Sequence, residues 1–172
     1  MTNEQRAEKI KGFVFDVDGT LTDGKIYISS EGEFCKAFNV KDGLAIAVLV
    51  KMGYKAAIIT GRKSMIVEKR AQELGIKNVY QGVRDKLAVF EEFCQKEHLA
   101  FDEVAYAGDD LNDIKVMCKV GLACAPYDAA NDIKEVAHFI SSRDAGQGAI
   151  REVIEFVMKA QGKWQDAINS FR

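Results

Sequence analysis

Two aspartates stand one residue apart in the stretch FDVDGTLTDG, which spans residues 15–24. Asp16 and Asp18 follow a short apolar run, and Gly19 allows the chain to turn directly behind them. One carboxylate of such a pair can attack a substrate as a nucleophile while the other transfers a proton. An acidic turn with a glycine has the same appearance, so the interpretation depends on the rest of the chain.

Further polar side chains that could join such a site recur later in the sequence. Thr60 lies in IITGR, Lys86 in VRDKL, and Asp109, Asp110 and Asp113 in GDDLND. Each has an ordinary explanation, because threonine can cap a helix, lysine can cover a solvated helix face and aspartate favours a helix N-terminus. Their occurrence together, in this order and at the ends of predicted strands, favours a single functional site.

The elements that must position these side chains alternate along the chain. We predict strands at residues 13–15, 56–59, 79–80, 104–107, 122–125 and 139–140, and helices at residues 44–52, 64–74, 85–97, 110–118 and 148–160. This alternation is typical of an α/β fold, a Rossmann-like parallel sheet with helices on both faces. Ligands of such sheets bind beyond the carboxyl ends of the strands, where Asp16, Thr60 and Asp109 are expected.

The domain organisation follows from the spacing of these patterns. Two short strands at residues 25–29 and 33–38 predict a β-hairpin flap at about residues 24–38. We expect one domain over residues 1–172, with a C-terminal helix and tail at about residues 148–172. No stretch between the predicted elements is long enough for a cap domain.

Composition excludes several classes of protein. The net charge of −2 does not suit a general nucleic-acid binder. The four cysteines form no C-x-x-C pair and only two histidines occur, so a zinc site is not expected. We expect reduced thiols, no membrane partner and a cytoplasmic location, because no apolar signal core or membrane-length run is present. No G-x-G-x-x-G follows the first predicted strand, which argues against dinucleotide binding.

The motifs DVDGT, ITG, DK and GDDLND, in that order, resemble those of the haloacid dehalogenase superfamily over nearly the whole chain. The resemblance implies that Asp16 is the nucleophile that forms an aspartyl phosphate and that Asp18 is the general acid and base. It implies Mg²⁺ as cofactor, bound by Asp16, the backbone carbonyl of Asp18, and Asp109. The remaining roles that it implies are phosphate binding by Thr60, Gly61 and Lys86, and orientation of metal-bound water or of Lys86 by Asp113.

Within that superfamily the chain resembles the capless 3-deoxy-D-manno-octulosonate 8-phosphate (KDO 8-phosphate) phosphatases. The stretches KAFNVKDG, ITGRKS, YQGVRDKL and AQGKW carry this resemblance. It implies hydrolysis of that sugar-acid phosphate to the free sugar acid of lipopolysaccharide biosynthesis. It also implies a homotetramer in which neighbouring subunits cap the site, with the hairpin as the lid. The substrate-binding residues that we expect are Arg62, Arg70, Asn39, Lys41, Asp42 and Gly43.

Three alternatives stay open. A phosphatase for a nine-carbon ulosonic or sialic acid 9-phosphate would keep the same chemistry, although Arg62 favours the eight-carbon substrate. A phospho-receiver signalling domain also combines acidic residues with a threonine and a lysine, but here Asp109 follows Lys86 in the wrong order. A noncatalytic regulatory subunit is disfavoured because Asp16 and Asp18 are intact.

Overall fold

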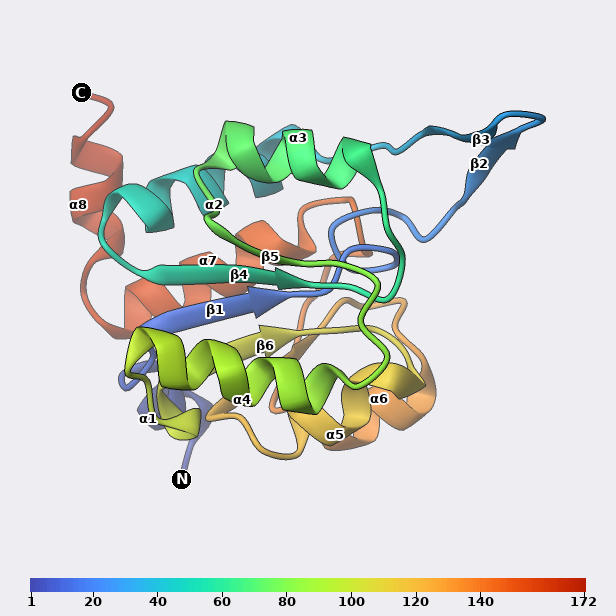
Figure 1. Cartoon of the computed structure of the whole chain (residues 1–172). Helices are drawn as coiled ribbons and strands as arrows, with labels where there is room; N and C mark the ends of the chain where they lie inside the picture. Colours follow the sequence, from blue (N-terminus) through green and yellow to red (C-terminus); the bar gives the residue numbers. More distant parts are fainter.

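The computed structural model describes residues 1–172 and is built on a six-stranded sheet in the order β5-β4-β1-β6-β7-β8 (Figure 1). Every neighbouring pair of these strands is parallel. The strands are β1 (Gly12–Phe15), β4 (Lys55–Ile59), β5 (Asn78–Tyr80), β6 (Val104–Ala107), β7 (Leu122–Ala125) and β8 (Phe139–Ile140). All six predicted strands of the sheet are therefore confirmed.

Helices cover both faces of the sheet. The α-helices are α1 (Asn3–Ala7), α2 (Val40–Lys51), α3 (Met65–Leu74), α4 (Lys86–Glu97), α5 (Ile114–Met117), α6 (Asn131–Val136), α7 (Ala149–Ala160) and α8 (Trp164–Asn169), and the 3-10 helices are η1 (Phe101–Glu103) and η2 (Leu111–Asp113). One apolar cluster joins α1, α2, α3, α7 and α8 to the sheet, and a second joins α4, α5 and α6 to the other face. The predicted Rossmann-like architecture is confirmed.

Alternation along the central strand explains these two cores. Phe13 and Phe15 point into the first cluster and Val14 into the second, and all three are fully buried. Successive side chains of a strand point to opposite faces, so a strand covered on both sides is apolar at every position. The run GFVF therefore specifies a central strand, and Asp16 is the first polar side chain beyond it.

The helix boundaries depend on capping side chains that the periodicity does not reveal. Helix α2 begins at Val40, before the predicted residue 44, because the Asn39 side chain accepts hydrogen bonds from the backbone of Lys41 and Asp42. The continuous helix predicted for residues 110–118 is wrong. The chain there forms η2 and then α5, since the Asp113 amide bonds to the carbonyl of Asp110 at 2.8 Å, a 3-10 contact.

Three short helices, α1, α6 and α8, were not predicted, and α8 lies in the segment expected to be a polar tail. Their five or six residues are too few for a clear helical period.

None of the helices combines the length and the apolar character that crossing a membrane requires.

The predicted hairpin is confirmed and consists of β2 (Tyr27–Ser29) and β3 (Gly32–Cys35), which pair antiparallel. It projects from the body of the molecule near the carboxyl ends of the sheet strands (Figure 1). Ile28 and Phe34 expose 68% and 74% of their surface. These apolar side chains thus lie outside both cores of the chain.

Candidate active site

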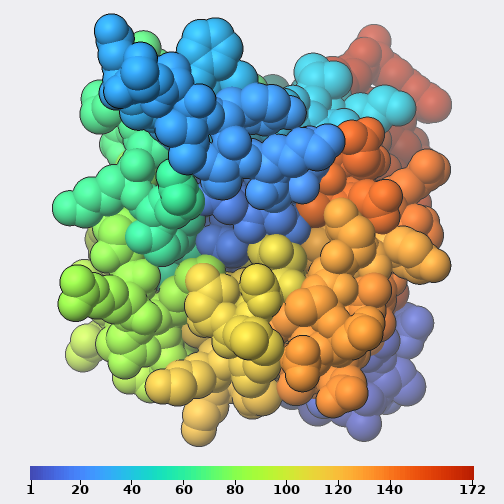
Figure 2. Space-filling view, turned by 90° about the vertical axis from the view of Figure 1, so that its right-hand side faces the viewer, coloured from blue at the N-terminus to red at the C-terminus, as the bar shows by residue number.

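The carboxyl ends of three adjacent strands form the floor of a cavity of about 380 Å³. Asp16 follows β1, Thr60 follows β4 and Asp109 comes shortly after β6. Figure 2 looks onto this edge of the sheet, where residues near the start of the chain lie at the bottom of a hollow. The residues that line the cavity are Asp16, Asp18, Thr60, Gly61, Arg62, Asp109, Asp110, Leu111 and Asn112.

A tight turn carries the chain away from Asp16. The amides of Thr20, Leu21 and Thr22 all donate to the carbonyl of Val17, at 2.9 to 3.1 Å. Gly19 within this turn has a φ of 86°, and a Cβ atom there would lie 2.1 Å from Asp109 Oδ2. Only glycine permits both the backbone conformation and the close approach of Asp109.

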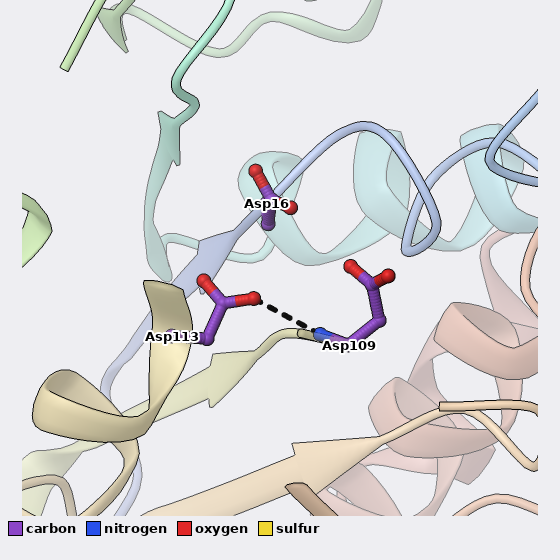
Figure 3. Close-up of side chains that lie close together, drawn as sticks. All are labelled: Asp16, Asp109 and Asp113. Atoms are coloured by element: carbon purple, nitrogen blue, oxygen red, sulfur yellow. Dashed lines mark hydrogen bonds between the residues drawn. The ribbon is translucent and has the colours of Figure 1, made fainter. Parts of the chain in front are cut away.

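Asp16 and Asp109, which line the cavity, converge with the fully buried Asp113 (Figure 3). Asp16, Asp109 and Asp113 each offer an oxygen within 4.8 Å of the others. The pKa of Asp16 is raised to about 6, mainly by burial and secondly by the charge of Asp113, while Lys86 has the opposite effect. The pKa of Asp109 is raised to about 8, mainly by burial and secondly by the charges of Asp16 and Asp113. A cation between these carboxylates would relieve the repulsion that raises both pKa values.

Asp113 differs from the other two aspartates in the hydrogen bonds that it accepts. Its Oδ1 accepts from Lys86 Nζ at 2.7 Å and from the Tyr106 hydroxyl at 2.6 Å. Its Oδ2 accepts from the amides of Asp109 at 3.0 Å and Asp110 at 3.4 Å. A carboxylate has about four acceptor positions. Asp113 therefore holds the loop and the lysine in place, which leaves Asp16 and Asp109 as the carboxylates available to a hard cation.

Lys86 links two of these carboxylates at the start of α4. Its Nζ lies 3.0 Å from Asp16 Oδ1 and 2.7 Å from Asp113 Oδ1, and the residue is 3% exposed. Burial alone would lower the pKa of Lys86, but the two carboxylates outweigh it and the pKa is raised. The ammonium therefore stays charged beside Asp16, where it can attract an anion.

Asp18 lies in the same cavity, but its carboxylate takes no part in the three-aspartate cluster. Lys36 Nζ lies 2.5 Å from Asp18 Oδ1, and Arg62 Nε lies 3.9 Å from Oδ2. The structure thus separates the two aspartates of the DVD motif into different environments.

Thr60, Gly61 and Arg62 line the cavity next to Asp16. The backbone of Thr60 is fixed on both sides, because its amide donates to Tyr80 at 3.0 Å and its carbonyl accepts from Val83 at 3.1 Å. Thr60 is 2% exposed, whereas the Arg62 side chain is 51% exposed. A hydroxyl at the floor and a guanidinium at the rim can bind two different anionic groups of one ligand.

The other expected substrate-binding residues do not line this cavity. Asn39 caps α2, and Asp42 is 2% exposed and accepts from the backbone amide of Arg151 at the start of α7. Gly43 packs against Arg70, whose Nη2 would lie 2.1 Å from a Cβ atom at that glycine. Within this chain the contacts of Asn39, Asp42 and Gly43 are those of structural residues.

Arg70 and Lys41 lie in two other hollows of the surface. Arg70 borders one with Ile66 and stacks over the Phe38 ring, with its Cζ 5.6 Å from the ring centroid. Lys41 borders a polar hollow that also contains Arg151. Any contact of these two side chains with a substrate at Asp16 stays a prediction.

Three contributors to the site were not predicted from the sequence. Tyr106 supports Asp113 from within β6, Thr20 donates to Asp109 Oδ1 at 3.0 Å, and Lys36, directly after β3, contacts Asp18. A lone hydroxyl in the buried run VAYA signals a buried hydrogen bond without naming its partner. Lys36 gives no such signal, because lysine is ordinary on an exposed hairpin.

Comparisons with known proteins agree with this arrangement. Residues 78–154 match the family described as haloacid dehalogenase-like hydrolase. The chain is 43% identical over 163 residues to the 3-deoxy-D-manno-octulosonate 8-phosphate phosphatase of Yersinia pestis. The aligned region covers 95% of this chain and 87% of the relative. The chain is 44% identical over 162 residues to the enzyme of that name from Escherichia coli strain K12, covering 94% and 86%.

A solved structure extends the likeness to three dimensions. The crystal structure of the 3-deoxy-D-manno-octulosonate 8-phosphate phosphatase from Moraxella catarrhalis, in complex with a magnesium ion, a phosphate ion and KDO, superimposes with a TM-score of 0.95. It is 40% identical, and the match covers 99% of this chain and 98% of that chain. The chain therefore belongs to the 3-deoxy-D-manno-octulosonate 8-phosphate phosphatase family of haloacid dehalogenase-like hydrolases, and is a phosphoric monoester hydrolase.

Proposed function

We propose that this chain hydrolyses 3-deoxy-D-manno-octulosonate 8-phosphate to the free sugar acid and inorganic phosphate, with Mg²⁺ as cofactor. The observation that carries the proposal is the buried ion pair of Lys86 with Asp16, which lines the cavity, in a chain 44% identical to an enzyme of that activity. The Moraxella catarrhalis relative, crystallised with magnesium, phosphate and KDO, supports the choice of cofactor and substrate.

The donor set fits a hard cation. Asp16 and Asp109 have oxygens within 4.8 Å of one another, and like charge contributes to the raised pKa of each. We propose these carboxylates and the backbone carbonyl of Asp18 as the protein ligands, and Asp113 as the residue that orients Lys86. When bound, Mg²⁺ neutralises charge on the phosphate and its nucleophile.

The protein's own groups can then carry out two displacements at phosphorus. In the first, an Asp16 oxygen forms a bond to phosphorus and the bond from phosphorus to the sugar oxygen breaks, giving an aspartyl phosphate. In the second, water attacks the same phosphorus and Asp16 leaves as a carboxylate. We propose that the Lys86 ammonium, the Thr60 hydroxyl and the Gly61 amide hold the phosphoryl oxygens, since Thr60 and Gly61 line the cavity and Lys86 contacts Asp16.

We propose that Asp18 supplies the proton that these two reaction steps need. The sugar alkoxide is a poor leaving group, so a carboxylic acid must protonate it as the ester bond breaks. Asp18 then accepts a proton from the attacking water and returns to its starting state. Its side chain supports this role, because it lines the cavity and is 18% exposed.

We further propose a homotetramer in which the hairpin of one subunit covers the cavity of its neighbour. The exposed Ile28 and Phe34 support an apolar contact for the hairpin, since isolated apolar strands are rarely left in water. The resemblance to the capless family supports the number of subunits. A cytoplasmic location is supported by the four free cysteines, which are typical of a reducing compartment.

A panel of phosphate esters tests the proposed function. It contains the eight-carbon and nine-carbon ulosonate phosphates, hexose phosphates and nucleotides, each assayed with Mg²⁺ and with EDTA. We expect the highest kcat/KM for the eight-carbon ester and loss of turnover in EDTA. Preference for the nine-carbon ester would show that the nine-carbon compound is the substrate. Full activity in EDTA would contradict the proposed dependence on Mg²⁺.

A further inference from the structure

Lys36 of the hairpin is buried although most of its neighbours are exposed. Its side chain is 2% exposed, and its Nζ lies 2.5 Å from Asp18 Oδ1. Strand β2, by contrast, is exposed at every residue. We infer that Lys36 is a positioning residue that fixes the carboxylate of Asp18 for proton transfer, an inference that rests on the proposed phosphatase chemistry.

A second contact anchors this lysine from behind. Glu33 Oε1 lies 2.9 Å from Lys36 Nζ, and Glu33 Oε2 accepts from the Ser64 hydroxyl. The same Ser64 oxygen caps α3 by accepting from the amides of Ile66 and Val67. A chain of polar contacts therefore runs from the N-terminus of α3 through the hairpin to Asp18.

The electrostatics favour a fixed geometry. The Lys36 ammonium lies between two carboxylates, 2.5 Å from Asp18 Oδ1 and 2.9 Å from Glu33 Oε1. A buried ammonium with two carboxylate partners is costly to displace, since either partner left alone would be an unpaired charge. Because Lys36 holds Oδ1, the Oδ2 atom of Asp18 is the oxygen left to exchange a proton, with Arg62 Nε 3.9 Å away.

Lys36 does not act by binding substrate directly. Its side chain is almost completely covered, and it is absent from the residues that line the cavity. It acts through Asp18 instead. The hairpin that carries Lys36 also carries the exposed Phe34. A contact that fixes the position of the hairpin therefore also fixes the position of Asp18.

The test compares leaving groups rather than one substrate. The parameter kcat/KM reports steps up to departure of the alcohol, and p-nitrophenolate departs without a proton whereas an alkoxide needs one. We would assay Lys36→Met on the eight-carbon sugar-acid ester, on a simple alkyl phosphate without a carboxylate, and on p-nitrophenyl phosphate. Lys25→Met is the matched control, because that hairpin lysine is 72% exposed.

We expect Lys36→Met to lower kcat/KM on the order of 10²-fold for both alkyl esters, and far less for the aryl ester. Lys25→Met should leave all three values within about twofold, as expected for a surface charge. Glu33→Gln, which keeps a partner for Ser64, should give the same pattern with a smaller amplitude. It also serves as the test if Lys36→Met does not fold, and hydrolysis of the aryl ester shows that each variant is folded.

Two results would overturn the inference. An equal loss on all three esters would assign Lys36 a structural role only, and a loss confined to the ester with a carboxylate would make it a substrate contact. The comparison of the two simple esters requires no preference for the sugar acid. If the proposed substrate is wrong, the wild-type enzyme will show no preference for the sugar-acid ester. If the proposed role of Lys36 is wrong, Lys36→Met will not affect the simple alkyl ester more than the aryl ester.

Discussion

Burial sets the properties of the two carboxylates at the bottom of the cavity. It is the largest cause of the raised pKa of Asp16, about 6, and of Asp109, about 8. A raised carboxyl pKa means that the folded protein binds protons that the unfolded chain has released. The contribution of these two groups to the free energy of unfolding therefore falls as the pH rises from 3.8 through about 8, as long as no cation is bound.

We accordingly expect the cation-free protein to unfold at a lower temperature at pH 8 than at pH 6. Added Mg²⁺ should reverse this, by about 2.7 kcal/mol at a hundredfold excess over its Kd. Differential scanning calorimetry with EDTA or Mg²⁺ measures both effects. Asp109→Asn should remove most of the response to Mg²⁺, whereas Asp102→Asn, at a 62% exposed side chain, should not. Equal stabilisation of both variants by Mg²⁺ would place the ion elsewhere.

Arg62 at the rim is suited to the carboxylate of a sugar acid. We expect Arg62→Ala to raise KM for the sugar-acid ester about tenfold or more, because a charged hydrogen bond to the substrate is lost. The change for p-nitrophenyl phosphate should be much smaller, because that ester has no carboxylate. Steady-state kinetics on both esters checks this. Equal effects would place Arg62 at the phosphate instead.

At the scale of residues, the sequence reveals the groups that follow strands. Asp16, Thr60 and Asp109 were predicted together because parallel strands end at the same edge of the sheet. Tyr106 and Lys36 were not predicted. Their partners, Asp113 and Asp18, depend on how distant segments pack, and no local pattern encodes that.

At the scale of elements, α2 and α7 meet through a buried cap. Asp42 in the first turn of α2 accepts from the Arg151 amide at 2.8 Å, in the first turn of α7. Its Oδ2 has no hydrogen-bond partner. Asp42 was predicted to bind substrate from the family motif KDG, but its burial supports a role in joining the two helices.

We expect Asp42→Ala to lower the free energy of unfolding by about 0.5–2 kcal/mol, the usual cost of removing a helix cap. Urea titration measures this change. Asp166→Ala is the control, since that exposed aspartate also stands in the first turn of a helix. An unchanged stability together with a large rise in KM for the sugar-acid ester would restore the predicted binding role.

At the scale of the whole molecule, the β-α alternation predicted the layers of the fold well. Strand order was not predicted, because it depends on long-range pairing rather than on local pattern. The six strands follow from apolar runs such as GFVF, whereas the path of the hairpin does not, since its partners lie on other elements. We propose that residues 1–172 act as one domain, and that its exposed hairpin completes a neighbouring site.

Phe34 offers a test of that assembly. It is 74% exposed, so Phe34→Lys should leave the stability of a single chain nearly unchanged but disfavour burial of the hairpin against a neighbour. We expect a lower mass by light scattering and a higher KM for the sugar-acid ester. Glu31→Lys provides a control for added charge on the same hairpin. A wild-type protein that is monomeric and fully active would contradict the proposed tetramer.

In the proposed reaction the phosphoryl group passes through Asp16. The most direct measurement is mass spectrometry of enzyme quenched in acid during turnover of the sugar-acid ester. We expect the peptide that contains Asp16 to gain one phosphoryl group, and the Asp16→Asn variant to show neither this gain nor hydrolysis. Phosphorylation of another residue, or undiminished hydrolysis by Asp16→Asn, would exclude Asp16 as the nucleophile.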